Sequence, residues 1–250
     1  IRKFFDIASD MKNVISLSVG EPDFVTPWNV RVAAISSIEQ GRTHYTSNYG
    51  MMELRELISE YLSSRYHVQY PAEQVLVTIG ASEALDLAFR AILEPGDEVL
   101  VPAPSYVSYE PGVAFCHGVP VPVETKEEDN FILTPEQIER VITKKTKAIV
   151  LPYPNNPTGA IMTREQLDAI RTVILKHDLF VISDEIYSEL TYGQRHVSFA
   201  EGMEDRTLLI NGFSKAFAMT GWRLGYACGP APLIAAMVKI HQYTMLCAPI

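Results

Sequence analysis

The sequence predicts an α/β fold, because short apolar runs typical of strands alternate with amphipathic segments typical of helices. A second observation supports this class: almost every apolar run is followed by a loop rich in Gly, Pro, Asn, Asp or Ser, and such loops would gather at one edge of a sheet. The seven expected strands are residues 75–79, 98–101, 119–123, 147–151, 179–183, 207–210 and 224–228.

Local signals set the expected helix boundaries. Pro27 precedes the first helix and Gly41 ends it, while Thr134 and Thr163 are suited to cap the helices that follow them. The expected helices are 28–40, a segment around 54–62, segments that end near 93 and 116, one that starts at 135, and 163–177 and 232–245.

Composition limits the possible functions. The 250 residues are 47% hydrophobic, which is ample for a buried core in one large or two small domains. The 30 acidic residues outnumber the 21 basic ones, which argues against binding to nucleic acid or an acidic membrane surface. No apolar run reaches about 18 residues, so no membrane span is expected, and the first residues lack a signal-peptide core. Three scattered cysteines indicate no metal site and a reducing, cytoplasmic location.

The loop after the first strand is a candidate anion site. Gly80-Ala81-Ser82 joins a strand to a helix, and the start of a helix offers unpaired N–H groups and a positive dipole end, which favour phosphate. The stretch lacks the glycine patterns of dinucleotide and nucleoside triphosphate sites. The simpler alternative is that Ser82 caps the helix without any ligand.

Three later loops present polar or aromatic side chains just after strands. Two prolines stiffen the loop before Tyr106, and three prolines surround Asn156. Asp184 ends an apolar strand, and Tyr187 follows three residues later. Each could instead be structural: Tyr106 a core aromatic, Asn156 a turn residue and Asp184 a hydrogen-bonded turn former.

Lys215 follows the sixth strand, which Gly212 is expected to break, and Arg223 comes eight residues later. At the carboxyl end of a buried strand a lysine is partly desolvated, which lowers its pKa and makes a nucleophilic amine available. A loop lysine in water is the alternative for Lys215 taken alone.

These motifs occur in an order that resembles class I and II aminotransferases, the fold-type I enzymes that use pyridoxal 5'-phosphate (PLP). The resemblance rests chiefly on Asn-Pro-Thr-Gly at 156–159 and on the lysine segment 211–226, with Gly-Glu-Pro-Asp at 20–23 in support. It extends from Val14 to the end of the chain. It is greatest to aspartate, aromatic and N-acetyl-diaminopimelate aminotransferases.

The resemblance implies roles in catalysis and substrate binding. Lys215 would hold PLP as a Schiff base and, once free, would move the substrate's α-proton. Asp184 would keep the pyridine nitrogen protonated, so that the ring is an electron sink. Tyr187 and Asn156 would bond the cofactor's phenolic oxygen, and Asn156 and the backbone of Gly20 would lie near the substrate carboxylate.

It also implies how the rest of the cofactor is held. Ala81, Ser82, Ser214 and Arg223 would bind the phosphate, with Arg223 as a bidentate, permanently charged partner. Tyr106 would stack on the pyridine ring.

The implied architecture is a three-layer αβα domain with a seven-stranded, mostly parallel sheet in which the seventh strand is antiparallel. Residues 1–40 would form an N-terminal arm and part of a small domain, and residues 41–250 the PLP-binding large domain. The protein would be a homodimer in which Tyr45 reaches the phosphate of the other subunit.

Two departures from the family pattern stand out. Many relatives have Ser or Thr where this chain has Gly212, so Ser214, Arg223 and the Ala81-Ser82 turn would have to bind more of the phosphate. The family's C-terminal small domain, with the arginine that binds the substrate's α-carboxylate, is expected to be missing beyond Ile250.

The function expected from these observations is amino-group transfer between an L-amino acid and a 2-oxo acid by a ping-pong mechanism, within amino acid metabolism. A PLP-dependent carbon–sulfur lyase on the same fold is one alternative. A non-catalytic PLP-fold module, such as the sensing half of a regulator, is another. Keto-acid production that requires an added acceptor would separate the transferase from the lyase.

Overall fold

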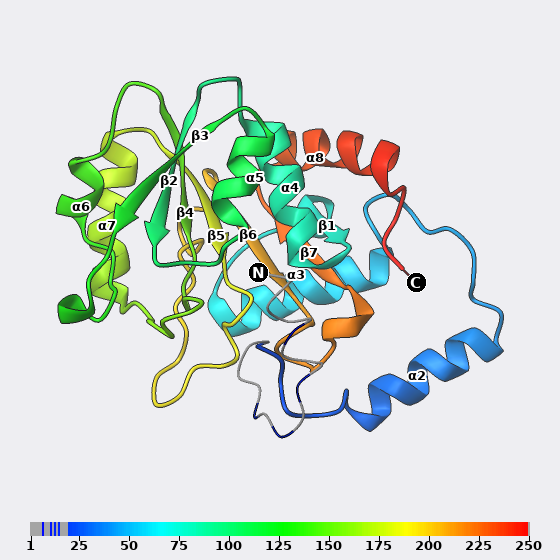
Figure 1. Cartoon of the computed structure of the whole chain (residues 1–250). Coiled ribbons are helices and arrows are strands. Elements are labelled where there is room, and N and C mark those ends of the chain that lie inside the picture. Colours follow the sequence, from blue (N-terminus) through cyan, green and yellow to red (C-terminus); the bar gives the residue numbers. More distant parts are fainter. Residues whose placement is uncertain (1–6, 8–10, 12, 14, 16–19, 250) are drawn as a thin grey trace.

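The computed structural model describes residues 7, 11, 13, 15 and 20–249 (Figure 1). Seven strands form one sheet in the spatial order β1-β7-β6-β5-β4-β2-β3. All neighbouring strands are parallel except at β7, which is antiparallel to both β1 and β6. The expected seven-stranded sheet with an antiparallel seventh strand is therefore confirmed. The strands are β1 (Val75–Thr78), β2 (Glu98–Ala103), β3 (Val119–Glu124), β4 (Thr146–Leu151), β5 (Phe180–Asp184), β6 (Thr207–Gly212) and β7 (Gly225–Cys228).

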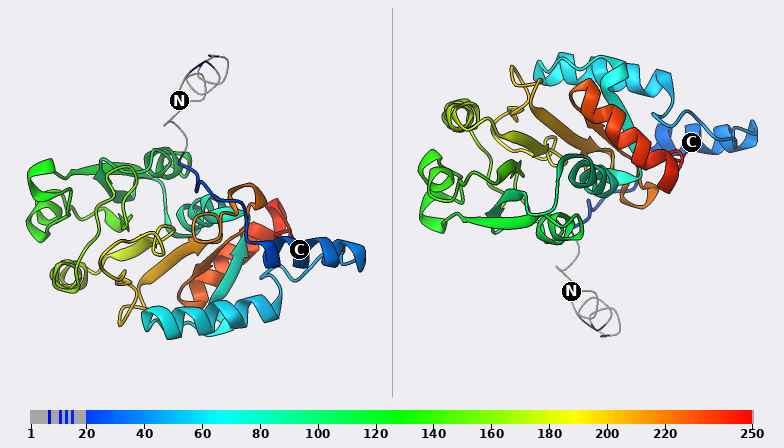
Figure 2. Two further views of the ribbon diagram at one scale, coloured as in Figure 1. Left: turned by 90° about the horizontal axis from the view of Figure 1, so that it is seen from below. Right: turned by 90° about the horizontal axis from the view of Figure 1, so that it is seen from above.

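Helices cover both faces of the sheet, as the two views of Figure 2 show. The α-helices are α2 (Trp28–Glu39), α3 (Met52–Tyr66), α4 (Gly80–Ile92), α5 (Tyr109–Phe115), α6 (Pro135–Glu139), α7 (Arg164–Lys176) and α8 (Ala231–Thr244). Short 3₁₀ turns lie at η1 (Ala72–Gln74), η2 (Glu127–Asp129) and η3 (Thr220–Trp222). Thr134 and Thr163 cap α6 and α7 in full capping boxes, as expected from the sequence.

The core alternates along each strand, because successive side chains of a strand point to opposite faces. In β4, Ala148 and Val150 pack on the face covered by α4, α5 and α8, whereas Ile149 and Leu151 pack against α6 and α7. The second face continues beneath α3, where Ile58 and Leu62 contact the β1–β7 end of the sheet. These three layers bury the central strands, whereas the edge strand β3 stays partly exposed, and the polar loops follow the carboxyl ends of the strands.

Two details differ from the sequence-based expectation. Gly212 does not break the sixth strand but is its last residue, paired with Gly225 of β7. Ser82 is not a helix cap: α4 begins at Gly80 after Ile79, and no side chain caps it. The first difference arises because pairing with β7, which is distant in the sequence, extends β6 to Gly212. The second concerns only the ligand-free alternative for Ser82, since the helix expected after the first strand is present.

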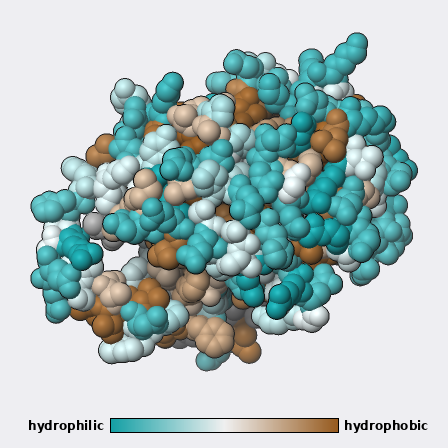
Figure 3. Space-filling view, turned by 180° about the vertical axis from the view of Figure 1, so that it is seen from behind, coloured by the Kyte–Doolittle hydropathy of each residue, from teal (hydrophilic) through white to brown (hydrophobic). Residues whose placement is uncertain are grey.

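Helix α2 stands apart from the body of the molecule (Figure 1), and none of its residues is buried. Its apolar side chains Trp28, Val32, Ile35 and Ile38 are exposed, and hydrophobic residues gather in the corresponding corner of the space-filling view (Figure 3). Among the described residues, no helix is long and apolar enough to cross a membrane.

Candidate active site

Lys215 lies in the loop after β6, beyond the carboxyl end of that strand, and its amine is half-buried among the residues of the candidate site. Its Nζ lies 5.5 Å from the centroid of the Tyr187 ring and donates to the carbonyl oxygen of Gly20 at 2.6 Å. Burial lowers the pKa of Lys215; the charge of Glu21 opposes this effect and that of Arg223 adds to it. The amine is therefore easier to deprotonate than a lysine in water.

Asp184 is buried at the end of β5, where its carboxylate is held from two sides. Tyr109 Oη donates to Asp184 Oδ2 at 2.8 Å, and the N–H of Ile186 donates to Oδ1 at 3.3 Å. Burial raises the pKa of Asp184 to about 6, against the lowering effect of these two hydrogen bonds. Among the described residues this carboxylate has no ion-pair partner, so a cationic group bound beside it would compensate its charge.

Asn156, in the loop after β4, and Tyr187, in the loop after β5, meet at the candidate site. Asn156 Nδ2 donates to Tyr187 Oη at 3.3 Å, and burial, followed by the charge of Asp184, raises the pKa of Tyr187. The neighbouring Asn155 is buried and donates to the carbonyl oxygen of Pro104 at 3.3 Å, which ties the loop that follows β4 to the one that follows β2. The bond between Asn156 and Tyr187 thus joins the loops after β4 and β5 beside the amine of Lys215.

Arg223 is packed against the start of α4. It adopts a left-handed backbone conformation with φ of +53°, and its Nη1 donates to the carbonyl oxygen of Thr220 at 3.1 Å. A Cβ added to Gly80, whose φ is +74°, would lie only 2.7 Å from Arg223 Nη2. The guanidinium is therefore held against a turn whose backbone only glycine adopts readily, beside the N-terminal N–H groups of α4.

The two strands below this turn leave no spare room. A Cβ at Gly225 would lie 2.6 Å from the backbone nitrogen of Ala81, and a Cβ at Gly212 would lie 2.9 Å from the Cα of Gly225. A serine or threonine at position 212 would not fit here unless β7 moved, because the backbones of β6 and β7 approach closely at Gly212 and Gly225.

Residues 20–26 of the N-terminal segment contact the same candidate site. Besides the contact of Gly20 with the lysine, Thr26 Oγ1 donates to the carbonyl oxygen of Ala218 at 2.6 Å and accepts from Trp222 Nε1 at 3.0 Å. These bonds join residues 20–26 to the segment between Lys215 and Arg223, although almost two hundred residues separate them in the sequence.

The other expected site residues are placed less closely. Tyr106 lies edge-on to Tyr109, with ring centroids 5.6 Å apart, and is thereby connected to Asp184. Ser214 is partly buried next to the lysine, and Ser82 is exposed in the first turn of α4. Tyr45 is 84% exposed.

Sequence reasoning missed Tyr109, which holds the carboxylate of Asp184. The available signal was its spacing: it follows Tyr106 by three residues at the start of a helix, so both rings lie on one side. It also missed Glu185, which is buried and accepts from Ser183 Oγ and Ser198 Oγ, both at 2.8 Å, and contacts His196 Nε2 at 2.7 Å. This network holds the loop at 196–199 beneath the end of β5.

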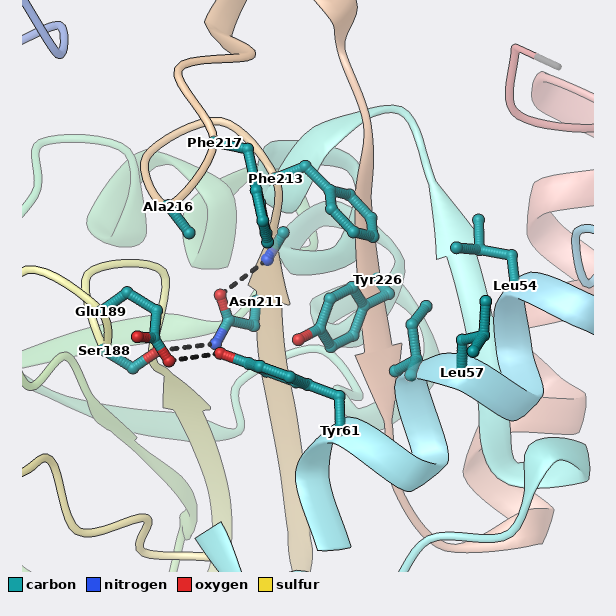
Figure 4. A pocket seen from close by; sticks show the side chains of 12 residues that line it. Leu54, Leu57, Tyr61, Ser188, Glu189, Asn211, Phe213, Ala216, Phe217 and Tyr226 are labelled. Atoms are coloured by element: carbon teal, nitrogen blue, oxygen red, sulfur yellow. Dashed lines mark hydrogen bonds between the residues drawn. The ribbon is translucent and has the colours of Figure 1, made fainter. Parts of the chain in front are cut away.

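A cavity of about 220 Å³ lies between α3 and the lysine segment (Figure 4). Apolar side chains such as Leu57, Phe213 and Phe217 form most of its wall, while Asn211 and Glu189 lie at its polar end. Ala216 lines this cavity but Lys215 does not, since its amine lies over Tyr187. The apolar cavity is therefore not the space around the Lys215 amine.

Known proteins are similar to this chain in sequence and in fold. The family model for aminotransferase class I and II matches residues 12–249. The protein YugH of Bacillus subtilis is 54% identical over 100% of this chain, and an aspartate aminotransferase of Pyrococcus abyssi is 44% identical over 99% of it. A Thermus thermophilus aspartate aminotransferase solved with maleate superposes with a TM-score of 0.96 at 42% identity, over 99% of this chain. The chain spans 64–65% of the length of these relatives.

Proposed function

Because the chain belongs to the class I and II aminotransferase family, we propose that the protein transfers an amino group between an L-amino acid and a 2-oxo acid in a ping-pong reaction, with PLP bound covalently by Lys215. Enzymes of this family use PLP. One observation carries the proposal: a half-buried lysine amine of lowered pKa lies over the ring of Tyr187, and buried Asp184 is close enough to Tyr187 for its charge to raise the pKa of that tyrosine.

The residues present fit the cofactor. Asp184 is a buried carboxylate without an ion-pair partner in the described residues, and a protonated pyridine nitrogen is the cation that would compensate it. The guanidinium of Arg223 and the N–H groups at the start of α4 form a positive cradle suited to a phosphate. Ala81, Ser82 and Ser214 would complete this cradle, and Tyr106 would pack on the ring.

Each side chain then has a defined task. PLP, when bound, supplies an electron sink for the negative charge that develops at the substrate's α-carbon. Lys215 Nζ, with its lowered pKa, would accept the α-proton of the substrate after the substrate's amine has replaced Lys215 on the cofactor. Asp184, held by Tyr109, would keep its charge at the ring nitrogen, and Asn156 and Tyr187 would orient the phenolic oxygen. Gly20, now bonded to the amine, would be near the incoming substrate.

We further propose a cytoplasmic homodimer. The exposed position of Tyr45 supports its contribution to the site of a second subunit. All three cysteines are free, which supports a reducing compartment. Residues 1–40 are assigned to an arm and part of a small domain, and residues 41–250 to the cofactor domain; the separation of α2 from the sheet supports this division.

The proposal is tested by adding PLP to the purified protein and recording its visible absorption. Wild type should acquire a band distinct from that of free PLP, and Lys215→Ala should not. Lys239→Ala, which removes an exposed lysine from α8, is the matched control and should keep the band. A band that survives in Lys215→Ala would refute the assignment. Amino-group transfer should then require an added 2-oxo acid, whereas keto-acid release without one would indicate a lyase.

A further inference from the structure

Glu83, in the first turn of α4, makes two contacts that connect the proposed phosphate turn to a distant helix. Its Oε2 accepts from the backbone N–H of Ile79 at 2.6 Å, and its Oε1 lies 2.7 Å from Nδ1 of His241 on α8. The imidazole is completely buried and the Glu83 side chain is 9% exposed. Since Nδ1 faces a carboxylate, it is the ring nitrogen that carries the proton and donates.

Glu83 bonds one backbone N–H group at the start of α4, and the next three have no partner among the described residues. Ile79 is the residue before α4, and the first backbone N–H groups of a helix have no partner within it. Glu83 occupies the Ile79 N–H, while the N–H groups of Gly80, Ala81 and Ser82 donate no hydrogen bond to the described residues. The carboxylate thus fixes the entry to the helix and leaves the next three donors available beside Arg223.

The Glu83–His241 pair is expected to contribute little net stability to the fold. Burying a carboxylate with an imidazole costs desolvation that their attraction does not reliably offset. In addition, His241 Nε2 is buried without a hydrogen-bond partner among the described residues. What the pair does provide is a rigid connection between α8 and Ile79, one residue before the left-handed Gly80.

We propose that Glu83 and His241 are positioning residues that hold the N-terminal turn of α4 in the conformation that binds the phosphate of PLP. This inference rests on the proposed function. His241 orients Glu83, Glu83 holds the Ile79 N–H, and Gly80–Ser82 consequently present their N–H groups to the anion. Neither side chain touches the cofactor.

The test compares the affinities of the full chain for PLP and for pyridoxal, which lacks the phosphate. Glu83→Met fills the space of the carboxylate but removes the acceptor for the Ile79 N–H. Loss of this hydrogen bond to a charged group should reduce the PLP-to-pyridoxal affinity ratio about tenfold. Glu83→Gln keeps an acceptor for Ile79 and should stay within about threefold of wild type. Asp86→Asn, which changes an exposed carboxylate on the same helix, is the matched control and should keep the wild-type ratio.

A merely structural role would weaken both ligands equally and leave the ratio unchanged in Glu83→Met, and that result would overturn the inference. An equal loss in Glu83→Gln would also overturn it. If Glu83→Met does not fold, the double variant Glu83→Met/His241→Leu replaces the buried pair by apolar groups, and the same fall in the ratio is expected. A wild type that binds pyridoxal as well as PLP would instead refute the proposed phosphate site itself.

Discussion

Replacing Asp184 by Asn should stabilise the cofactor-free protein near neutral pH. The carboxylate is buried, has no ion-pair partner among the described residues, and has its pKa raised from 3.8 to about 6. At about 1.4 kcal/mol per pH unit, this difference corresponds to about 3 kcal/mol of lost stability when the group is ionised. Asparagine is close in size and keeps an acceptor for the Ile186 N–H, so it removes the charge with little change in packing.

The sign of the pH dependence follows from linkage. The folded state binds the proton of Asp184 more tightly than the unfolded state, so this group's contribution is fully present below about pH 3.8 and is lost as pH rises through about 6. The advantage of Asp184→Asn over wild type should therefore grow between about pH 4 and pH 6 and then remain constant, at about 1–3 kcal/mol.

Urea unfolding of the cofactor-free proteins at pH 4 and pH 7.5 measures this directly. Asp86→Asn, an exposed carboxylate paired with Arg90, is the control and should show little difference at either pH. With PLP present, wild type should gain more stability than Asp184→Asn, because in the proposed site only the wild-type carboxylate would compensate a protonated ring nitrogen. The reasoning is refuted if Asp184→Asn is no more stable than wild type at pH 7.5, or if its advantage is the same at both pH values.

Two further substitutions test the packing and the electrostatics around the lysine segment. Gly212→Ser should destabilise the fold by about 1–3 kcal/mol, because its Cβ would meet the Cα of Gly225 at 2.9 Å; an unchanged urea midpoint would show that β7 yields easily. Burial opposes ionisation of Glu189, yet hydrogen bonds from Arg65 and two tyrosines lower its pKa to about 2. Its stabilising effect is present above pH 4.5 and lost as pH falls toward 2, so wild type should lose about 1–2 kcal/mol more than Glu189→Gln on acidification, and equal losses would contradict this.

Much of the fold could be predicted from local sequence. The strands are continuous apolar runs, and the capping residues Thr134 and Thr163 begin their helices as expected. Asp184 and Lys215 could be proposed as site residues because one ends a buried strand and the other follows one, and the parallel strands bring such positions to one edge of the sheet.

What escaped prediction depends on contacts between distant segments. Tyr109 bonds Asp184 from 75 residues away, and His241 bonds Glu83 from 158 residues away. The spacing of Tyr109 after Tyr106 is a local signal, but it does not identify Asp184 as the partner, and no local pattern encodes the contact of His241 with Glu83. The extension of β6 to Gly212 likewise depends on pairing with Gly225, since the apolar run itself ends at Ile210.

The central claim is that the amine of Lys215 is the group that holds PLP. Incubation of the full chain with PLP, reduction with borohydride and peptide mass spectrometry identify the lysine to which the cofactor becomes fixed. The pyridoxyl-phosphate label should lie on the peptide that contains Lys215, at near-stoichiometric amount. A label on another lysine, or one spread over the exposed lysines, would contradict the account.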